Sequence, residues 1–108
     1  MKNKILTLLG FAAKAGKLSY GMAKAKETLA RRKASLAVSA ADISAKSRKE
    51  IGFFCEKHNV KLLILDGFNI ETVSDAVGRR CGIITVNDSG FADAILKAYV
   101  EGGKANDE

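Results

Sequence analysis

The sequence predicts an α/β fold, a three-layer α/β/α sandwich in which helices cover both faces of a short, largely parallel central sheet. Three short apolar runs, each typical of a buried strand, recur at near-regular intervals, and segments of helical periodicity lie between them. This alternation of strand and helix is typical of a parallel sheet covered by helices. Apolar residues make up 47% of the 108 residues, so the chain can bury a core unaided.

Two helices are predicted ahead of the first strand. The first spans about residues 3–14, because apolar side chains recur there at the spacing of one helix face: Ile5, Leu8, Leu9 and Ala12. The second spans about residues 22–32, and Gly21 opens it.

The predicted strands are the three apolar runs, at residues 36–38, 62–65 and 83–86. Helices follow these strands, at about residues 44–58, 70–77 and 89–100. The first of them can begin at Ser44 or at the capping box Ser47-x-x-Glu50.

The chain carries no linker or low-complexity segment. Residues 1–102 are therefore expected to form one domain, and residues 103–108 a frayed tail. The apolar stretch near the N-terminus is broken by Thr7, Gly10 and Lys14, unlike the core of a signal peptide. No run approaches the roughly 20 apolar residues of a membrane span. We therefore expect a soluble, cytoplasmic protein with no membrane partner.

Residue types that carry chemistry are few. Cys55 and Cys81 lack the CxxC spacing of zinc sites and redox dithiols, so both are expected to be free thiols. The single histidine, His58, shares an apolar helix face with Cys55, where a structural role is expected. Asp42 and Asp66 follow strands, where a metal or phosphoacceptor site can form, although helix caps and turns explain both more simply. No nucleotide-binding glycine motif follows a strand.

The net charge of +6 is unevenly distributed. Residues 1–49 carry twelve Lys and Arg against two acidic residues, whereas residues 50–108 carry six against ten. A polyanion-binding site concentrates cations in this way, and nucleic acid is the favoured partner. The simpler interpretation is that the cations decorate exposed helix faces.

Two segments combine glycines with basic residues. The turn Lys14-Ala15-Gly16-Lys17 leads to Gly21, where a helix begins with exposed amides and lysines beside it, and such a helix start binds phosphate. The turn from Gly78 to Gly82 carries two arginines that can contact phosphates or stack on bases. A solvated loop is the alternative for each segment. The expected nucleic-acid-binding residues are Lys14, Lys17, Gly21, Lys24, Arg31, Arg79 and Arg80.

Seven short segments, spread over about residues 5–100, together form a recognisable sequence pattern. In order they are Leu8-Leu9-Gly10, Lys14-Ala15-Gly16-Lys17-Leu18, Gly21, Ala34-x-Leu36-Ala37-Val38 with Ala41-Asp42, Cys55-Glu56-x-x-Asn59-Val60, Gly78 and Val86-x-Asp88-x-Gly90-Phe91-Ala92. In this order and spacing they resemble the small bacterial members of the kink-turn-binding ribosomal protein superfamily, of the L-seven-Ae type.

This resemblance implies an α/β/α sandwich, no enzymatic activity, no cofactor and binding of structured RNA, commonly a kink-turn with sheared G·A pairs. It implies that RNA contacts the loop before the last strand and the start of the second helix, through a Gly-x-Asn-Glu-x-x-Lys pattern. Gly21 matches that pattern, but Ala23, Lys24 and Glu27 stand at the Asn, Glu and Lys positions. Base-specific contacts are therefore expected to be fewer, and phosphate contacts more numerous.

The sequence thus favours a non-enzymatic, monomeric ribosomal or ribosome-associated protein that binds structured RNA, such as ribosomal RNA, with no metal or cofactor and with ribosomal proteins as further contacts. Two other functions are open for this chain. One is a protein-interaction module that uses the acidic C-terminal half, and the other is a receiver-like or metal-dependent domain that uses Asp42 or Asp66.

Overall fold

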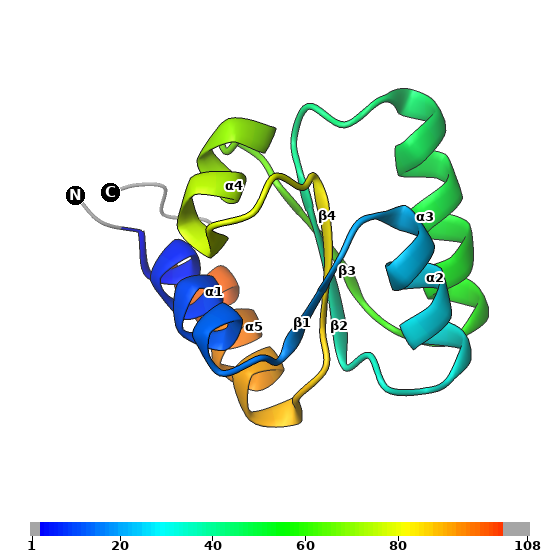
Figure 1. Cartoon of the computed structure of the whole chain (residues 1–108), viewed down its shortest axis with the longest axis horizontal. Helices are drawn as coiled ribbons and strands as arrows, with labels where there is room; N and C mark the ends of the chain where they lie inside the picture. Colours follow the sequence, from blue (N-terminus) through cyan, green and yellow to red (C-terminus); the bar gives the residue numbers. More distant parts are fainter. Residues whose placement is uncertain (1–2, 103–108) are drawn as a thin grey trace.

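The computed structural model describes residues 3–102, and the tail predicted at residues 103–108 lies outside this range. Within it, helices and strands alternate in the order α1 (Lys4–Lys14), β1 (Leu18–Tyr20), α2 (Met22–Ala30), β2 (Leu36–Ala40), α3 (Ala45–Lys57), β3 (Leu62–Leu65), α4 (Ile70–Val77), β4 (Ile83–Val86) and α5 (Ser89–Gly102) (Figure 1). The five predicted helices and three predicted strands are confirmed.

Polar side chains fix where several helices begin. The Asn3 side chain accepts the Ile5 N–H (2.8 Å) at the start of α1, and the Ser44 hydroxyl accepts the Ser47 N–H (3.0 Å) at the start of α3. Of the two predicted starts of α3, Ser44 is therefore the one used.

The strands form one sheet in the order β1-β4-β2-β3. Only β2 and β3 are parallel, whereas β4 runs antiparallel to both of its neighbours, β1 and β2. The α/β/α sandwich is confirmed, but the prediction of a largely parallel sheet was wrong. Because of these directions, β1, β2 and β3 end at the edge of the sheet where β4 begins. We call this the upper edge, at the top of Figure 1, and the opposite one the lower edge.

Two features explain the wrong prediction. Strand β1 has three residues with Ser19 at its centre, so it presents no apolar run. Helix α4 has only eight residues, about 12 Å, and the following segment, residues 78–82, returns the chain to the upper edge from which β3 left. Strand β4 therefore enters the sheet antiparallel to β2, although the alternation of strand and helix is the same as in a parallel sheet.

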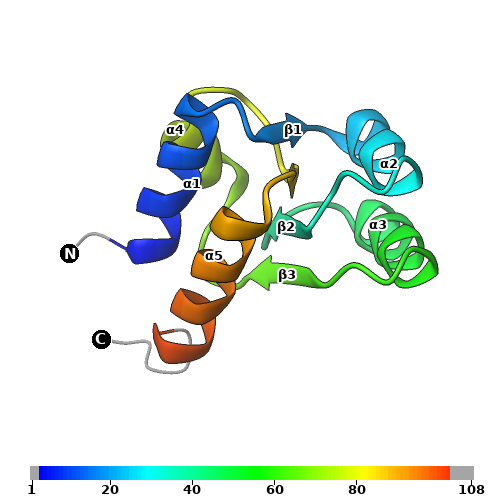
Figure 2. The ribbon, with the colours of Figure 1, turned by 90° about the horizontal axis from the view of Figure 1, so that it is seen from below.

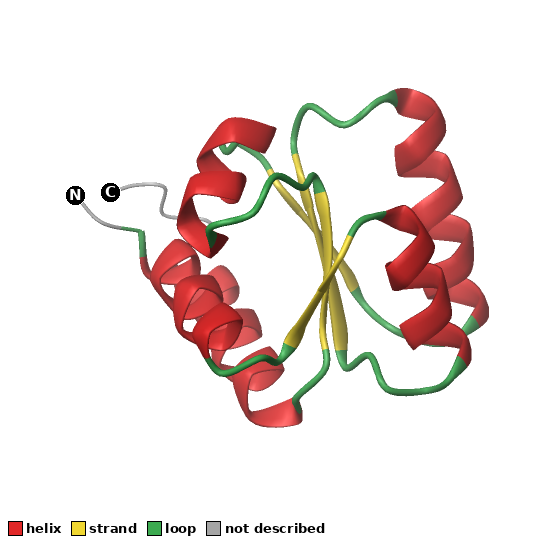
Figure 3. Ribbon diagram, viewed as in Figure 1, coloured by secondary structure: helices red, strands yellow, loops and turns green. Residues whose placement is uncertain are grey.

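The sheet has a helical layer on each face, as Figure 3 shows, and a hydrophobic core lies between the sheet and each layer. Helices α1, α4 and α5 cover one face, and α2 and α3 cover the other. Alternate residues of β2 serve the two cores, since Val38 faces the first layer and Ala37 the second. Burial on both faces is why β2 and β4 are mainly apolar, with Ser39 and Thr85 as buried hydroxyl residues.

Candidate nucleic-acid interface

The start of α2 lies against the segment that leads into β4. The Gly21 N–H donates to the Ile83 carbonyl oxygen (2.8 Å), which joins the chain before α2 to the first residue of β4. Gly21 has φ +89°, which L side chains rarely adopt, while the space around it is open. Backbone conformation, and not crowding, therefore requires glycine at this position.

The first turn of α2 exposes backbone amides. Gly21 is the N-cap and supplies no capping side chain. The first intrahelical hydrogen bond runs from the Ala25 N–H to the Gly21 carbonyl oxygen (2.9 Å), so the amides of residues 22–24 precede the hydrogen-bonded ladder. Together with the positive end of the helix dipole, these amides can hold an anion.

A buried hydroxyl pair fixes α2 on the sheet. The hydroxyl oxygens of Thr28 and Thr85 lie 2.9 Å apart, and both residues are buried. Thr28 belongs to α2 and Thr85 to β4, so this hydrogen bond sets where α2 lies along β4.

The loop of residues 78–82 is held at both ends. At its start, the Gly78 N–H donates to the Ser74 carbonyl oxygen (2.8 Å). The Ser74 hydroxyl accepts the Cys81 N–H (3.0 Å) and donates to the Cys81 carbonyl oxygen (3.2 Å). At Gly82 a Cβ atom would lie 2.9 Å from Cγ2 of Ile43, so no larger residue fits there without movement. Arg79 and Arg80 are exposed between these fixed points.

Arg79 is stacked on an aromatic ring. Its guanidinium carbon lies 4.8 Å from the centre of the Tyr20 ring, and Tyr20 directly precedes Gly21. Burial and the Cys81 thiol raise the pKa of the Tyr20 hydroxyl, whereas Arg79 lowers it. The Arg79 side chain therefore connects the two segments that the sequence singled out.

Lys24, the predicted cation of α2 that lies near Gly21, is partly neutralised. Lys24 lies 3.5 Å from a carboxylate oxygen of Glu27, and Arg31 lies 3.6 Å from the other. All three side chains are well exposed, so these ion pairs contribute little to stability. Glu27, which replaces the Lys of the expected pattern, thus holds Lys24 close to the helix surface.

The seven predicted residues divide between the two edges of the sheet. Gly21, Lys24, Arg79 and Arg80 come to the upper edge, where α2 and β4 begin. The remaining three lie toward the lower edge. The Lys17 carbonyl oxygen accepts the Asn87 N–H (2.8 Å) where β4 ends, Lys14 ends α1, and Arg31 is the C-cap of α2.

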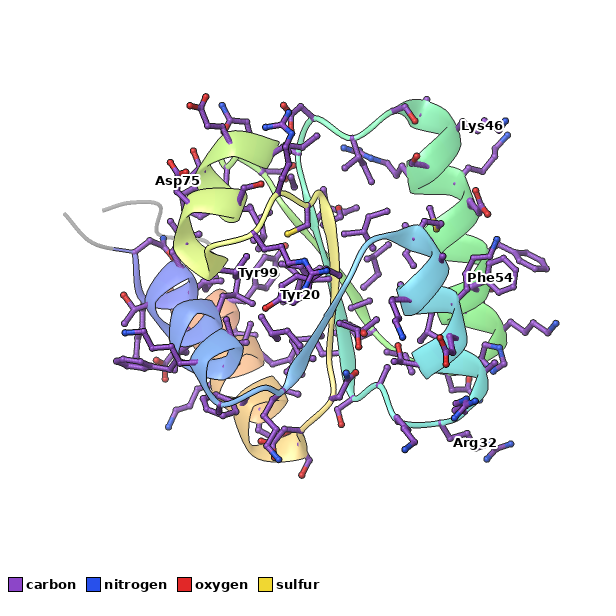
Figure 4. The ribbon with its side chains drawn as sticks, viewed as in Figure 1. Tyr20, Arg32, Lys46, Phe54, Asp75 and Tyr99 are labelled. Atoms are coloured by element: carbon purple, nitrogen blue, oxygen red, sulfur yellow. The ribbon has the colours of Figure 1, made fainter. Side chains whose placement is uncertain are left out.

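Sequence reasoning missed two contributors to the upper edge, Tyr20 and the start of α3. Lys46 lies at the first turn of α3, at the top of Figure 4, and Arg48 reaches back to donate to the Ala41 carbonyl oxygen (2.9 Å). The sequence signal for this strand was the alternation of apolar Leu18, polar Ser19 and aromatic Tyr20, which is typical of a strand with one buried face.

Most of the residues considered for other chemistry are buried or lie at helix caps. Cys55 is a buried free thiol whose pKa burial raises to about 11, and His58 is the half-buried C-cap of α3. Cys81 is also a free thiol, as predicted. The Asp42 carboxylate accepts the Ile70 N–H (2.7 Å) and so caps the start of α4, while Asp66 is exposed in the turn after β3. Within residues 3–102, no group of three potential metal ligands gathers.

A protein-family model matches most of this chain. The model of the ribosomal protein L7Ae/L30e/S12e/Gadd45 family matches residues 3–95. The chain belongs to this family. In this L7Ae-family chain the match extends from the start of α1 into α5, so it includes both segments of the upper edge.

Solved structures share the fold of this L7Ae-family chain. One is a protein with unknown function from Bacillus halodurans C, with a TM-score of 0.85, 22% identity, and coverage of 90% of this chain and 97% of the other. Another is the Giardia lamblia 15.5kD RNA binding protein, with a TM-score of 0.73, 15% identity, and coverage of 93% and 85%. The comparison with curated protein sequences gives no match. No helix within residues 3–102 has the length and apolar character needed to cross a membrane.

Proposed function

We propose that this L7Ae-family protein binds structured RNA through its upper edge, as a ribosomal or ribosome-associated protein, and performs no catalysis. The observation that carries the proposal is the stacking of Arg79 on Tyr20, which brings a basic loop beside the uncapped start of α2. Family membership and the fold shared with an RNA-binding protein support it.

Each component of the upper edge offers a different contact. The amides of residues 22–24 and the guanidinium of Arg80 suit phosphate oxygens, because both are donors at a positive site. Arg79 presents the outer face of its guanidinium above Tyr20, where an unstacked base can lie against it. Lys24 adds a flexible cation when it leaves Glu27.

The kink-turn is the RNA we propose as the starting ligand, with ribosomal RNA as its source. Ala23 cannot hydrogen-bond a base edge through its side chain, and Lys24 can only donate. Contacts to phosphate and sugar position an RNA without reading its sequence. We therefore propose that the protein holds the shape of the bent backbone more than it reads the G·A pairs.

Charge-neutralising variants test the proposal. The double variant Arg79→Gln/Arg80→Gln is compared with Lys4→Gln/Lys97→Gln, which removes the same charge from exposed residues of α1 and α5, outside the loop of residues 78–82 and the start of α2. We expect the first pair to weaken binding of a kink-turn RNA at least tenfold in a gel-shift titration, and the control to change it less than threefold. Equal effects of both pairs would mean that charge acts without a defined site and would overturn the proposal.

A further inference from the structure

A second basic surface lies at the lower edge, at the far ends of α2 and α3. Both helices run from the upper edge to the lower edge, so their C-termini lie side by side there (Figure 2). The Ala37 N–H donates to the Lys61 carbonyl oxygen (2.9 Å), which holds the loop before β3 against the start of β2. Five exposed basic residues come together in this way and form what we call the lower basic surface: Arg31, Arg32, Lys33, Lys57 and Lys61.

Little negative charge offsets this surface. Among residues 3–102, the ion pairs that involve its members are limited to Arg31 with Glu27 (3.6 Å), and Glu56 adds one exposed carboxylate on α3. Cations at a helix C-terminus ordinarily compensate the negative end of the helix dipole. Compensation of the helix dipole accounts for one or two of these five cations. The backbone conformation of Arg32 points to a further role for the surface.

The helices α1 to α4 all end in the same kind of turn. An N–H donates to the carbonyl oxygen five residues earlier in each: Lys17 to Ala12, Lys33 to Thr28, Val60 to Cys55 and Arg79 to Ser74. Such a turn needs a residue in the left-handed region just before the donor. The four residues with positive φ in these turns are Gly16 (72°), Arg32 (61°), Asn59 (56°) and Gly78 (75°).

Arg32 is the exception among these four residues. Glycine and asparagine are the types that adopt this conformation readily, whereas an arginine there is strained. Its side chain extends from the lower right of Figure 4 into solvent, and it is exposed. Packing therefore does not explain why arginine stands at this position, and strain of this kind is found where function requires a particular side chain.

We propose that the lower basic surface is a second RNA contact, which binds the phosphate backbone of another helical segment of the RNA held at the upper edge. The location of the first contact rests on the proposed function above. A polyanion fits because five exposed cations with one ion pair occupy the ends of two adjacent helices. The two contacts lie about 14 Å apart along α2, so one bent RNA can reach both.

Two kink-turn RNAs provide the probe. Both carry the same kink, but their flanking helices have about four base pairs in one and about sixteen in the other, a length that double-stranded-RNA-binding domains span. The test variant is Arg32→Gly/Lys61→Gln, and the control is Lys4→Gln/Lys97→Gln. Replacing Arg32 with glycine removes backbone strain and Lys61 is exposed, so we expect the test variant to unfold at a temperature no lower than that of the wild type. Weaker binding by the test variant is then not a consequence of misfolding.

We expect the test variant to bind the long RNA at least tenfold more weakly at about 0.1 M salt. The slope of the logarithm of the binding constant against the logarithm of salt concentration should be smaller in magnitude by roughly 1.5. Its affinity for the short RNA should stay within twofold of the wild type. Unchanged binding of the long RNA would overturn the inference and would favour an acidic protein surface as the partner. Equal weakening for both RNAs would overturn it as well, since the charges would then act without a site.

The Arg79→Gln/Arg80→Gln variant separates this inference from the proposed function. If it weakens binding of both RNAs while the lower-surface variant weakens neither, only the second contact is wrong. If it weakens neither while the lower-surface variant weakens the long RNA, the upper site is wrong and the lower surface is the RNA contact.

Discussion

The guanidinium of Arg79 lies 4.8 Å from the centre of the Tyr20 ring, and this one contact joins the loop before β4 to the strand before α2. The two residues are 59 positions apart in the sequence. A flexible arginine in a loop loses much of its freedom when it binds RNA, whereas a stacked arginine has lost part of it beforehand. The aromatic ring is therefore expected to contribute to affinity without touching the RNA.

Replacing Tyr20 with leucine tests that contribution. Tyr20→Leu keeps an apolar side chain on the core but removes the ring face beneath Arg79, so we expect RNA affinity to fall about fivefold, equivalent to roughly 1 kcal/mol. A double-mutant cycle with Arg79→Gln measures the coupling. If the two effects simply add, Tyr20 does not act through Arg79.

The dependence of affinity on salt reports the number of phosphates that the protein neutralises. With about four to six contacts, a fourfold increase in salt should weaken binding by roughly two orders of magnitude or more. Fluorescence anisotropy titrations of a labelled kink-turn RNA at several salt concentrations provide the slope. Affinity that stays level over this range would exclude the electrostatic model.

Specificity is expected to be modest, because Ala23 and Glu27 stand where the family pattern has Asn and Lys. We expect the wild type to prefer a kink-turn over the same RNA with Watson–Crick pairs in place of its G·A pairs by about tenfold, or about 1.4 kcal/mol. Ala23→Asn/Lys24→Glu should widen that preference. A wild-type preference of a thousandfold or more would mean that other residues, such as those of the Arg79 loop, read the kink.

The buried hydroxyl pair gives a stability prediction. Thr28→Val leaves the Thr85 hydroxyl without its partner in the core, which should lower the free energy of unfolding by about 1–3 kcal/mol. The double variant Thr28→Val/Thr85→Val removes both hydroxyls and should recover part of that loss. Urea titrations followed by circular dichroism measure both. A double variant whose loss of unfolding free energy equals the sum of the losses in Thr28→Val and Thr85→Val would contradict this explanation.

The Cys55 thiol predicts how stability depends on alkaline pH. Burial raises its pKa from 9.0 to about 11, so the folded state holds the proton more tightly than the unfolded state. Its contribution to stability is therefore complete below about pH 9 and is lost as the pH rises toward 11. Cys55→Ala should show a shallower decline of unfolding free energy across that interval than the wild type. Parallel declines would show that other groups cause it.

Helices were predictable because each carries its own periodicity and start signal. Residues 70–77 are predicted and found as α4, and Ser44 is both a predicted and an observed cap. Strand direction was not predictable in the same way. Whether a helix returns the chain to the near or far edge depends on its length and orientation in space, and neither α4 nor the loop after it reveals this by composition.

The candidate site was predictable as segments but not as contacts. Gly21 and Arg79 stood out because a glycine before a helix and arginines between glycines have local chemical meaning. Tyr20 did not, because its role comes from a partner far along the chain. The grouping of Lys14 and Lys17 with Gly21 followed sequence proximity, yet β1 carries the chain from one edge of the sheet to the other between them.

The hydrogen bonds from Gly21 to Ile83 and between Thr28 and Thr85 hold α2 and β4 in a fixed relation. For the proposed RNA contact we therefore expect no rearrangement of the backbone, and a capture rate set by diffusion and by attraction between opposite charges. Such capture is similar for any RNA of similar charge. We therefore expect discrimination between RNAs to appear in how long each complex lasts, with correctly bent RNAs dissociating slowly and others soon after they bind.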